Sequence, residues 1–457
     1  MKKLEETKNF ITSEVNFMII NSIVVGGYKN VSKVKLDFTG ITALVAPNGF
    51  GKSNVLDAIK FGFNYIAASQ NEKALMMKNP LSQPKNKRII LQNYAIELVM
   101  SSQTNERPCT IKYSFEFSWQ NKDEGGKIVS ENLDIKHTDN KNNKFTKYVT
   151  RTSGATLYRT SVTGRCDTNL KIKDNELAIN RLALYDILFY QEVLQAINEM
   201  SFYTERRADV NINFIPSLTK DDNYPIDSLN INNMDDVPRY IHFLKINQPK
   251  KYELLIQSFK SLFPNISEVD VLEIDMEDFI KQTDKIELPS SIKNSAIFEL
   301  EKMYHLIVTD KNIEGFNLFP TLSSGTKKIF VFLAVAISAE INNISIIALE
   351  ELENSLHPAL MQRLISILEQ FAGNTRILLT SHSPYLIDCI KPKEMYLPVP
   401  NDDGTAEFNN ISSGREAKKV VNDAAKYNQG LGDYIFTLLS GDEDDFDILK
   451  SYLGVSE

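Results

Sequence analysis

The stretch of sequence that decides the fold is Ala46-Pro47-Asn48-Gly49-Phe50-Gly51-Lys52-Ser53. Directly before it, residues 41–45 form a short apolar run of the kind found in buried strands. After it, apolar residues recur at helical spacing from Val55 to about Tyr65. The sequence therefore predicts a strand, a loop with two glycines and a helix, one after the other.

Residues 48–53 carry most of the Walker A pattern, in which loop N–H groups and a helix N-terminus surround the β and γ phosphates of a nucleotide. We expect the ammonium of Lys52 to contact those phosphates and the hydroxyl of Ser53 to bind Mg²⁺. The first glycine of the usual pattern is Ala46 here, which is harmless only at negative φ. The plain alternative is a chance glycine turn before a helix. The predicted nucleotide-binding residues of this loop are Asn48, Gly49, Gly51, Lys52, Ser53 and Asn54.

A second apolar run, residues 346–349, ends in the adjacent acids Glu350 and Glu351. This is the Walker B pattern, in which a buried strand delivers a carboxylate on the Mg²⁺ side and then one that orients the attacking water. We predict Glu350 as a metal ligand, with one more methylene than the usual Asp, and Glu351 as the general base or water positioner. The alternative is two acids at the end of an exposed strand.

Two shorter patterns lie on either side of these acids. Ser323, Ser324 and Gly325 precede a very apolar helical segment, and they form either a plain serine N-cap or a second phosphate-binding helix terminus. His382 ends the apolar run 377–381, from which an imidazole could sense the γ-phosphate. A lone histidine is more often an ordinary surface or core residue, so only the order of the motifs makes it a candidate catalytic residue beside Lys52 and Glu351.

The composition of the 457 residues is that of an ordinary globular protein, with 42% hydrophobic and 24% charged residues. The net charge of −8 argues against a protein that coats nucleic acid through bulk charge, although it leaves room for a local basic patch. The three cysteines are far apart and form no CxxC pair, which excludes a disulfide framework and a cysteine-rich zinc site. No apolar segment suits a signal peptide or a membrane span, so we expect a cytoplasmic protein.

The rest of the chain predicts an α/β fold with a mixed or parallel sheet core, an antiparallel β lobe and a helical insertion. Successive β segments fill residues 94–160, helical spacing follows in 175–200 and 251–263, and residues 209–238 are a polar stretch interrupted by proline. Strands alternate with helices from residue 322 to 399. We divide the chain into an N-terminal lobe (17–170), a helical insertion (171–300), a C-terminal lobe (301–400) and a polar tail with two short helices (401–457).

The order of the motifs resembles that of the ATP-binding-cassette ATPases of the SMC, RecF and OLD type. Residues 350–358, EELENSLHP, and residues 380–384, TSHSP, are similar to strings found in the OLD-like AAA ATPases. The resemblance covers about 17–66 and 255–400. It implies an ABC-ATPase-like head that uses ATP and Mg²⁺, with Ser323, Ser324 and Gly325 as its signature loop.

The same resemblance implies a head-to-head dimer. In it, Lys52 and Ser53 of one subunit and Ser323 and Gly325 of the other would enclose each ATP, so that an isolated subunit would hydrolyse ATP poorly. A glutamine of the Q-loop type should link the insertion to Mg²⁺. Gln83 and Gln191 are candidates, although each is more often an ordinary surface residue.

The leading functional hypothesis is a sensor-scaffold ATPase of bacterial antiphage defence that controls a separate effector, a nuclease or a toxin, through ATP-dependent assembly. OLD proteins usually carry a Toprim nuclease after the ATPase, whereas the polar tail after His382 has no apolar strand leading to a paired DxD motif. Stand-alone ATPases of this kind occur in two-component systems such as PARIS and Septu. The link to defence is an analogy within the family.

The alternative is a DNA-repair clamp of RecF character. Between Lys136 and Lys173 nine Lys or Arg residues stand against two acids, interleaved with aromatic residues, which could follow the phosphates of duplex DNA or form a solvated hairpin face. A transporter cassette fits less well, because of the long insertion between the phosphate loop and the signature. An inactive, nucleotide-gated scaffold also stays open, because of Ala46 and Glu350.

Overall fold

The computed structural model of the chain describes residues 18–102, 108–121, 124–137, 144–185, 187–205, 217–219, 237–276, 278, 302–353, 356–401, 403–411 and 413–454. They form two compact units, each built from separate stretches of the chain. Unit 1 comprises residues 1–204, 343–348 and 374–457, and unit 2 comprises 205–342 and 349–373. Much of the polar stretch 209–238 lies outside the described residues.

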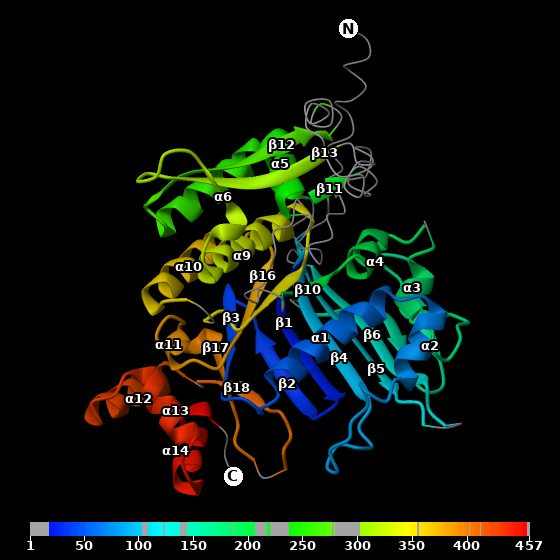
Figure 1. The fold of residues 1–457 in the computed structure, drawn as a ribbon. Coiled ribbons are helices and arrows are strands. Elements are labelled where there is room, and N and C mark those ends of the chain that lie inside the picture. Colours follow the sequence, from blue (N-terminus) through cyan, green and yellow to red (C-terminus); the bar gives the residue numbers. More distant parts are fainter. Residues whose placement is uncertain are drawn as a thin grey trace. The chain divides into compact units, whose positions relative to one another are not determined.

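An eight-stranded antiparallel sheet forms one layer of unit 1 (Figure 1). Side chains along its central strands alternate between buried and half-buried, which is the period of two expected of a sheet with one face on a core. The antiparallel lobe predicted from residues 94–160 is therefore confirmed. In spatial order its strands are β2 (Val31–Asp37), β1 (Met18–Tyr28), β4 (Tyr94–Ser102), β5 (Cys109–Ser118), β6 (Lys127–His137), β7 (Thr146–Arg151), β8 (Thr156–Arg159) and β9 (Cys166–Asn169).

Helix α1 (Lys52–Ala67) packs on the buried face of this sheet through an aromatic cluster. The hydroxyl of Tyr94 donates to the carbonyl of Ala58 at 2.9 Å, and the rings of Phe61 and Tyr94 lie 4.9 Å apart. Gly62 lets the helix approach, since a Cβ there would stand 2.4 Å from the Tyr94 hydroxyl. The helix that follows the phosphate loop is thus anchored on a rigid sheet.

The pair Gly26-Gly27 is a turn signal in the sequence, but β1 continues through both residues and no turn forms there. The chain turns instead at Lys29, which has a φ of 48°. A Cβ on Gly26 would lie 2.2 Å from the carbonyl oxygen of Ser32, and one on Gly27 would lie 1.8 Å from that of Asn93. These glycines are therefore needed where backbones approach each other closely, not for a turn.

We expect Gly27→Ala to lower the free energy of unfolding by about 3 kcal/mol, because the new methyl group would force β1 away from Asn93 and Gly27 has a φ of 69°. Gly40→Ala is the matched control, since a Cβ there meets nothing within 4 Å. Chemical denaturation of the two variants measures the difference. Equal stabilities would contradict the close approach of these backbones.

A buried carboxylate ties the segment after β9 to the same lobe. Glu131 of β6 accepts hydrogen bonds from the backbone N–H groups of Ala178 (2.6 Å) and Ile179 (3.1 Å) and from the hydroxyl of Tyr113 (3.2 Å). Burial raises the pKa of Glu131, and the two backbone N–H groups act in the opposite direction by stabilising the carboxylate. The pair of short helices α3 (Ala178–Leu182) and α4 (Gln191–Asn198) is thereby fixed at its start.

A second, six-stranded sheet carries the elements next to the phosphate loop. Its central strand β3 (Ile41–Val45) pairs in parallel with β16 (Arg376–Ser381) and with β17 (Met395–Pro398), as the alternation of strands and helices predicted. The outer strand β18 (Phe408–Asn410) is antiparallel to β17, so the sheet is mixed. The full order is β10 (Phe202–Glu205), β15 (Ile346–Glu350), β16, β3, β17 and β18. The predicted α/β fold class is confirmed.

Unit 1 ends in a group of three helices, one more than the sequence suggested. They are α12 (Gly414–Lys426), α13 (Leu431–Leu439) and α14 (Glu443–Leu453), and the hydroxyl of Tyr452 donates to Asp423 at 2.8 Å between α14 and α12. Helix α14 starts with four acids, and their carboxylates stabilise the positive end of the helix dipole. They are Asp442, Glu443, Asp444 and Asp445. The other helices of this unit are α2 (Gln70–Lys78) and α11 (Pro384–Ile387).

Unit 2 contains a small antiparallel sheet as well as helices, so residues 171–300 are not the purely helical insertion expected from their sequence. Strand β12 (Ile266–Asp275) pairs with β13 (Lys302–Asp310), which also pairs with β11 (Ser217–Thr219) and β14 (Asn317–Leu318). Helices α5 (Val237–Asn247) and α6 (Pro249–Leu262) pack on β12.

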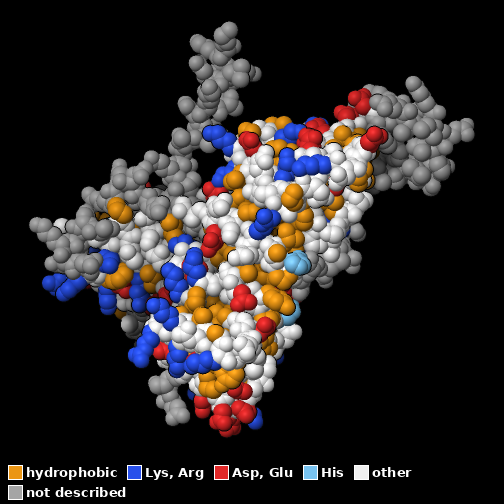
Figure 2. Space-filling model, turned by 90° about the vertical axis from the view of Figure 1, so that its left-hand side faces the viewer, with side chains coloured by type: hydrophobic (Ala, Val, Ile, Leu, Met, Phe, Trp, Pro, Cys, Tyr) orange, Lys and Arg blue, Asp and Glu red, His pale blue; other side chains and the backbone are white. Residues whose placement is uncertain are grey.

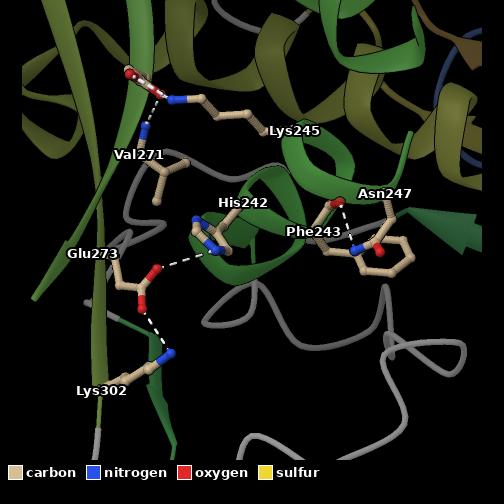
Figure 3. A network of polar contacts seen from close by, with 8 residues as sticks. His242, Phe243, Lys245, Asn247, Val271, Glu273 and Lys302 are labelled. Carbon is tan, nitrogen blue, oxygen red and sulfur yellow. Dashed lines mark hydrogen bonds and ion pairs between the residues drawn. The ribbon is translucent and has the colours of Figure 1, made fainter. Parts of the chain in front are cut away.

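Ion pairs attach α5 to this sheet. Figure 3 shows Glu273 of β12 between His242 of α5, whose Nε2 lies 3.2 Å from one carboxylate oxygen, and Lys302 of β13, whose ammonium lies 2.8 Å from the other. Lys245 of α5 donates to both carboxylate oxygens of Asp270, at 2.6 and 2.9 Å. These contacts hold α5 against β12 and join β12 to β13, so their role is structural.

A buried apolar helix, α9 (Ser324–Ile341), lies against two other helices of unit 2. It packs against α6 and α10 (Pro358–Phe371), and the rings of Phe259 and Phe319 stand 5.1 Å and 4.7 Å from that of Phe330. Phe319 lies on the short helix η5 (Phe319–Thr321), directly before the signature residues. No helix among the described residues has the length and apolar character needed to cross a bilayer.

Candidate functional site

The phosphate loop of unit 1 has the backbone conformation that its glycines predict. Gly49 and Gly51 have φ values of 92° and 88°, in the left-handed region that residues with a side chain avoid. Ala46 lies outside that region, so the departure from the usual pattern at this position is harmless, as the sequence analysis required. The loop thus has the curled form in which backbone N–H groups can surround an anion.

The N-terminus of α1 opens directly onto this loop. The helix begins at Lys52, its first turn contains no acidic residue, and no side chain caps it at Gly51. A helix terminus with neither an acid nor a side-chain cap suits the binding of phosphate oxygens, because its backbone N–H groups and the positive end of its dipole favour an anion. The ammonium of Lys52 lies within the loop, where it donates to the carbonyls of Ala46 (2.6 Å) and Pro47 (3.0 Å).

Two supports of the loop were not apparent from the sequence. The side chain of Asn54 donates to Asn30 at 2.7 Å, and Asn30 donates to the carbonyl of Gly404 at 3.2 Å. A Cβ on Gly51 would stand 2.6 Å from that of Ala406. The segment between β17 and β18 therefore packs against the loop, and Asn54, predicted to bind nucleotide, has a structural partner here.

His382 lies beside the phosphate loop in unit 1. It directly follows β16, and the last residue of that strand, Ser381, pairs with Val45 at the end of β3. The N–H of Ala46 donates to the carbonyl of Ser381 at 3.1 Å. Since both strands end at the same edge of the sheet, the half-buried His382 and the start of the loop are brought together, as the motif order implied.

The two candidate Q-loop glutamines both bond to backbone carbonyls within the lobe. The side chain of Gln83 donates to the carbonyl of Gln120 at 3.2 Å, and that of Gln191 donates to the carbonyl of Ala183. Both contacts lie within unit 1, and a role of either glutamine toward Mg²⁺ stays a prediction.

The signature residues belong to unit 2 and form the start of α9, which begins at Ser324, so that Ser324 and Gly325 lie inside the apolar helix that the sequence placed after them. Ser323 is the N-cap: its hydroxyl accepts from the N–H of Thr326 at 3.2 Å and contacts the Thr326 hydroxyl at 2.7 Å. Ser324 and the buried Gly325 occupy the first turn, which contains no acid. The structure confirms the plain serine N-cap, and the phosphate-binding role of this helix terminus stays a prediction.

Glu350 is the last residue of β15, and Glu351 directly follows it. The chain passes from unit 1 to unit 2 after Ala348, so both acids belong to unit 2. Glu351 has a φ of 52°, a left-handed conformation that costs a residue with a side chain about 1 kcal/mol. Its carbonyl accepts a hydrogen bond of 2.6 Å from the ammonium of Lys328, a buried residue of α9. The side chain of Glu351 is exposed.

The residues present fit a magnesium nucleotide. The left-handed glycines, the start of α1 and the amine of Lys52 give unit 1 a loop suited to an anion. Ser53 of unit 1 and Glu350 of unit 2 each carry an oxygen of the kind that Mg²⁺ takes. No group of three or more His, Cys, Asp or Glu residues that could hold a metal occurs in the described part of the chain.

A comparison with protein families finds one match. Residues 173–388, just under half of the chain, match the family model described as "AAA domain, putative AbiEii toxin, Type IV TA system". The matched range contains the signature residues, both acids and His382, and the phosphate loop lies before it.

Several solved structures resemble the chain. An SMC head bound to the C-winged helix domain of ScpA is 14% identical over 88% of this chain and 99% of its own, with a TM-score of 0.45. An SMC head domain from Thermotoga maritima is 14% identical over 86% and 100%, with a TM-score of 0.39. The recombination mediator RecF is 12% identical over 87% and 99%, with a TM-score of 0.36. At these TM-scores none of them supplies a residue role or a partner for this chain.

Proposed function

We propose that the chain is an ATPase and that two copies enclose each MgATP head to head. The observation that carries the proposal is the phosphate loop, with left-handed Gly49 and Gly51, Lys52 inside the loop and an open helix terminus behind it. The adjacent His382 and the family match over the signature and the two acids support it.

Each residue has one task in the proposed reaction. Lys52 binds the β and γ phosphates as a point charge, and the N–H groups of the loop bind the remaining oxygens. Ser53 and Glu350 hold Mg²⁺, which when bound neutralises charge on the phosphates. Glu351 orients the attacking water and accepts its proton, while His382 donates a hydrogen bond toward the γ-phosphate.

The partner subunit completes the site in this proposal. The capped terminus of α9 at Ser323 offers N–H groups of Ser324 and Gly325 to the γ-phosphate held by the other copy. ATP then binds the closed dimer more tightly than it binds a single subunit, and this difference in affinity drives assembly. Hydrolysis removes the γ-phosphate and with it the contact that holds the copies together.

The biological role that we propose is a sensor-scaffold of bacterial antiphage defence that controls a separate effector, a nuclease or a toxin. The description of the matching family model names a toxin of a type IV toxin–antitoxin system, and our proposal rests on the same kind of family analogy. The α12–α14 helices are a candidate contact for the effector, because Val421 and Tyr427 expose 47% and 66% of their surface there.

Co-purification of neighbouring gene products with the Glu351→Gln variant in MgATP tests this role. We expect a nuclease-like or toxin-like protein to be retained when ATP holds the dimer closed and to be lost with Lys52→Ala, which cannot hold the nucleotide. A reproducible absence of any partner from the Glu351→Gln sample would contradict the scaffold role while leaving the ATPase intact.

The alternative, a clamp on duplex DNA, has weaker support from the basic stretch 136–173. Arg151 and Arg159 are buried and donate to backbone carbonyls, and Lys147 of β7 lies opposite Asp134. Lysines and arginines do gather on part of the face in Figure 2, with acidic and hydrophobic side chains beside them. Salt-dependent, ATP-stimulated binding to bare duplex would favour the clamp over the effector scaffold.

A further inference from the structure

Lys328 is a cation inside the apolar helix α9 of unit 2. Only 5% of its surface is exposed, and its neighbours Ile329 and Phe330 are fully buried. Its ammonium donates to the carbonyl of Glu351 at 2.6 Å and lies 5.5 Å from the centre of the Phe332 ring. A buried ammonium is costly unless it is hydrogen-bonded, so a lysine at this position points to a specific task.

The atom that Lys328 holds belongs to the proposed water-positioning residue. Glu351 adopts a left-handed backbone conformation, which a glutamate does not adopt without support from its surroundings. The charge-assisted hydrogen bond from Lys328 to its carbonyl supplies such support. The direction in which the Glu351 side chain leaves the backbone is therefore set in part by a residue of helix α9.

The same helix begins with the signature residues. Lys328 lies four residues after Ser324, a rise of about 6 Å along the axis, and the intervening turn is closed by backbone hydrogen bonds and capped by Ser323. One turn of helix cannot change length, so a displacement of its N-terminus moves the ammonium of Lys328 with it. Ser323 and Glu351 are thus mechanically linked within unit 2.

We propose that Lys328 is a positioning residue that couples the signature helix to Glu351 of the same subunit. Ser323 and Gly325 contact the nucleotide that the partner subunit holds, and this contact fixes the position of the helical turn that carries Lys328. Lys328 then fixes the backbone of Glu351, and so positions the Glu351 carboxylate in the site of its own subunit. This inference rests on the proposed function and deepens it, because it makes hydrolysis at one site depend on contact at the other.

The test uses Lys328→Met, which fills the same space but cannot donate, and Lys328→Gln, whose shorter side chain does not reach the same carbonyl. We expect kcat to fall about tenfold or more in both variants, with the KM for ATP and the ATP-dependent dimer unchanged within about twofold. Lys328→Arg, which restores a charged donor, should recover most of kcat. If Lys328→Met does not fold, Lys328→Gln provides the test. A wild-type kcat in Lys328→Gln would overturn the proposal.

Two further measurements separate positioning from general damage to α9. Lys251→Met is the matched control, because Lys251 of α6 pairs with Glu340 near the other end of the same helix, and we expect wild-type kcat from it. In the Glu351→Gln background, Lys328→Met should reduce the residual kcat no further, because the group that it positions is gone. An equal loss in both backgrounds overturns the coupling, whereas a wild-type chain without ATP turnover contradicts the proposed function itself.

Discussion

Lys52→Ala should reduce the kcat for ATP hydrolysis by about 10²- to 10³-fold, the effect of removing one preorganised charge from a site of phosphoryl transfer. Lys52 is the cation that the structure places inside the phosphate loop, donating to the carbonyls of Ala46 and Pro47. Its loss also removes a support of the loop, so the affinity for ATP should fall as well. Phosphate release and the binding of a fluorescent ATP analogue measure the two effects.

Lys60→Ala is the matched control for this experiment. Lys60 lies on the same helix, α1, on its half-buried side two turns beyond the loop, and we give it no part in the site. Its kcat should stay within about twofold of wild type. If wild type and Lys52→Ala hydrolyse ATP at the same background rate, the chain is not an ATPase, and the hypothesis of an inactive nucleotide-gated scaffold takes its place.

Glu351→Gln should also reduce kcat strongly but, unlike Lys52→Ala, should leave the binding of ATP intact. The substitution keeps the size of the side chain but removes its capacity to accept a proton, so kcat should fall by about 10²- to 10⁴-fold while ATP still binds. ATP that is bound and not hydrolysed should hold the dimer closed. Sedimentation in MgATP should then give twice the subunit mass of 51.9 kDa.

Glu369→Gln controls for the loss of a charge from the same unit. Glu369 lies on the exposed face of α10, and its substitution should change neither kcat nor the mass in MgATP. A Glu351→Gln variant that keeps wild-type kcat would remove Glu351 from the reaction. A variant that stops hydrolysis but stays monomeric in saturating MgATP would contradict the head-to-head dimer.

The phosphate-loop half of the site could be predicted from the sequence because its determinants are local. Gly49 and Gly51 adopt left-handed conformations that other residues avoid, and the open start of α1 needs only the residues that follow them. The position of His382 beside Ala46 was also predictable. Parallel strands of an α/β sheet end at the same edge, so the residues that follow β16 and β3 lie next to each other there.

The supports of the site could not be predicted, because they are contacts between residues far apart in the chain. Ala406 packs against Gly51, and Lys328 holds the carbonyl of Glu351, yet neither contact leaves a periodic pattern in the sequence. Gly27 looked like a turn residue, since close backbone approach and a turn favour the same amino acid.

The small sheet of unit 2 was missed for a related reason. Strands β12 and β13 pair across about 26 residues, and nothing at either strand indicates the other as its partner. Asp270 and Glu273 also place charges in β12, where Lys245 and Lys302 pair with them, and these charges hide the alternation of apolar and polar residues.

The structure of Glu351→Gln with MgATP tests the central claim most directly. We predict a triphosphate whose β and γ phosphates contact Lys52 and Ser53 of one subunit and the signature residues Ser323 and Gly325 of the other, with Glu350 on the Mg²⁺ side. A nucleotide held wholly by one chain, or one bound away from Lys52, would contradict it.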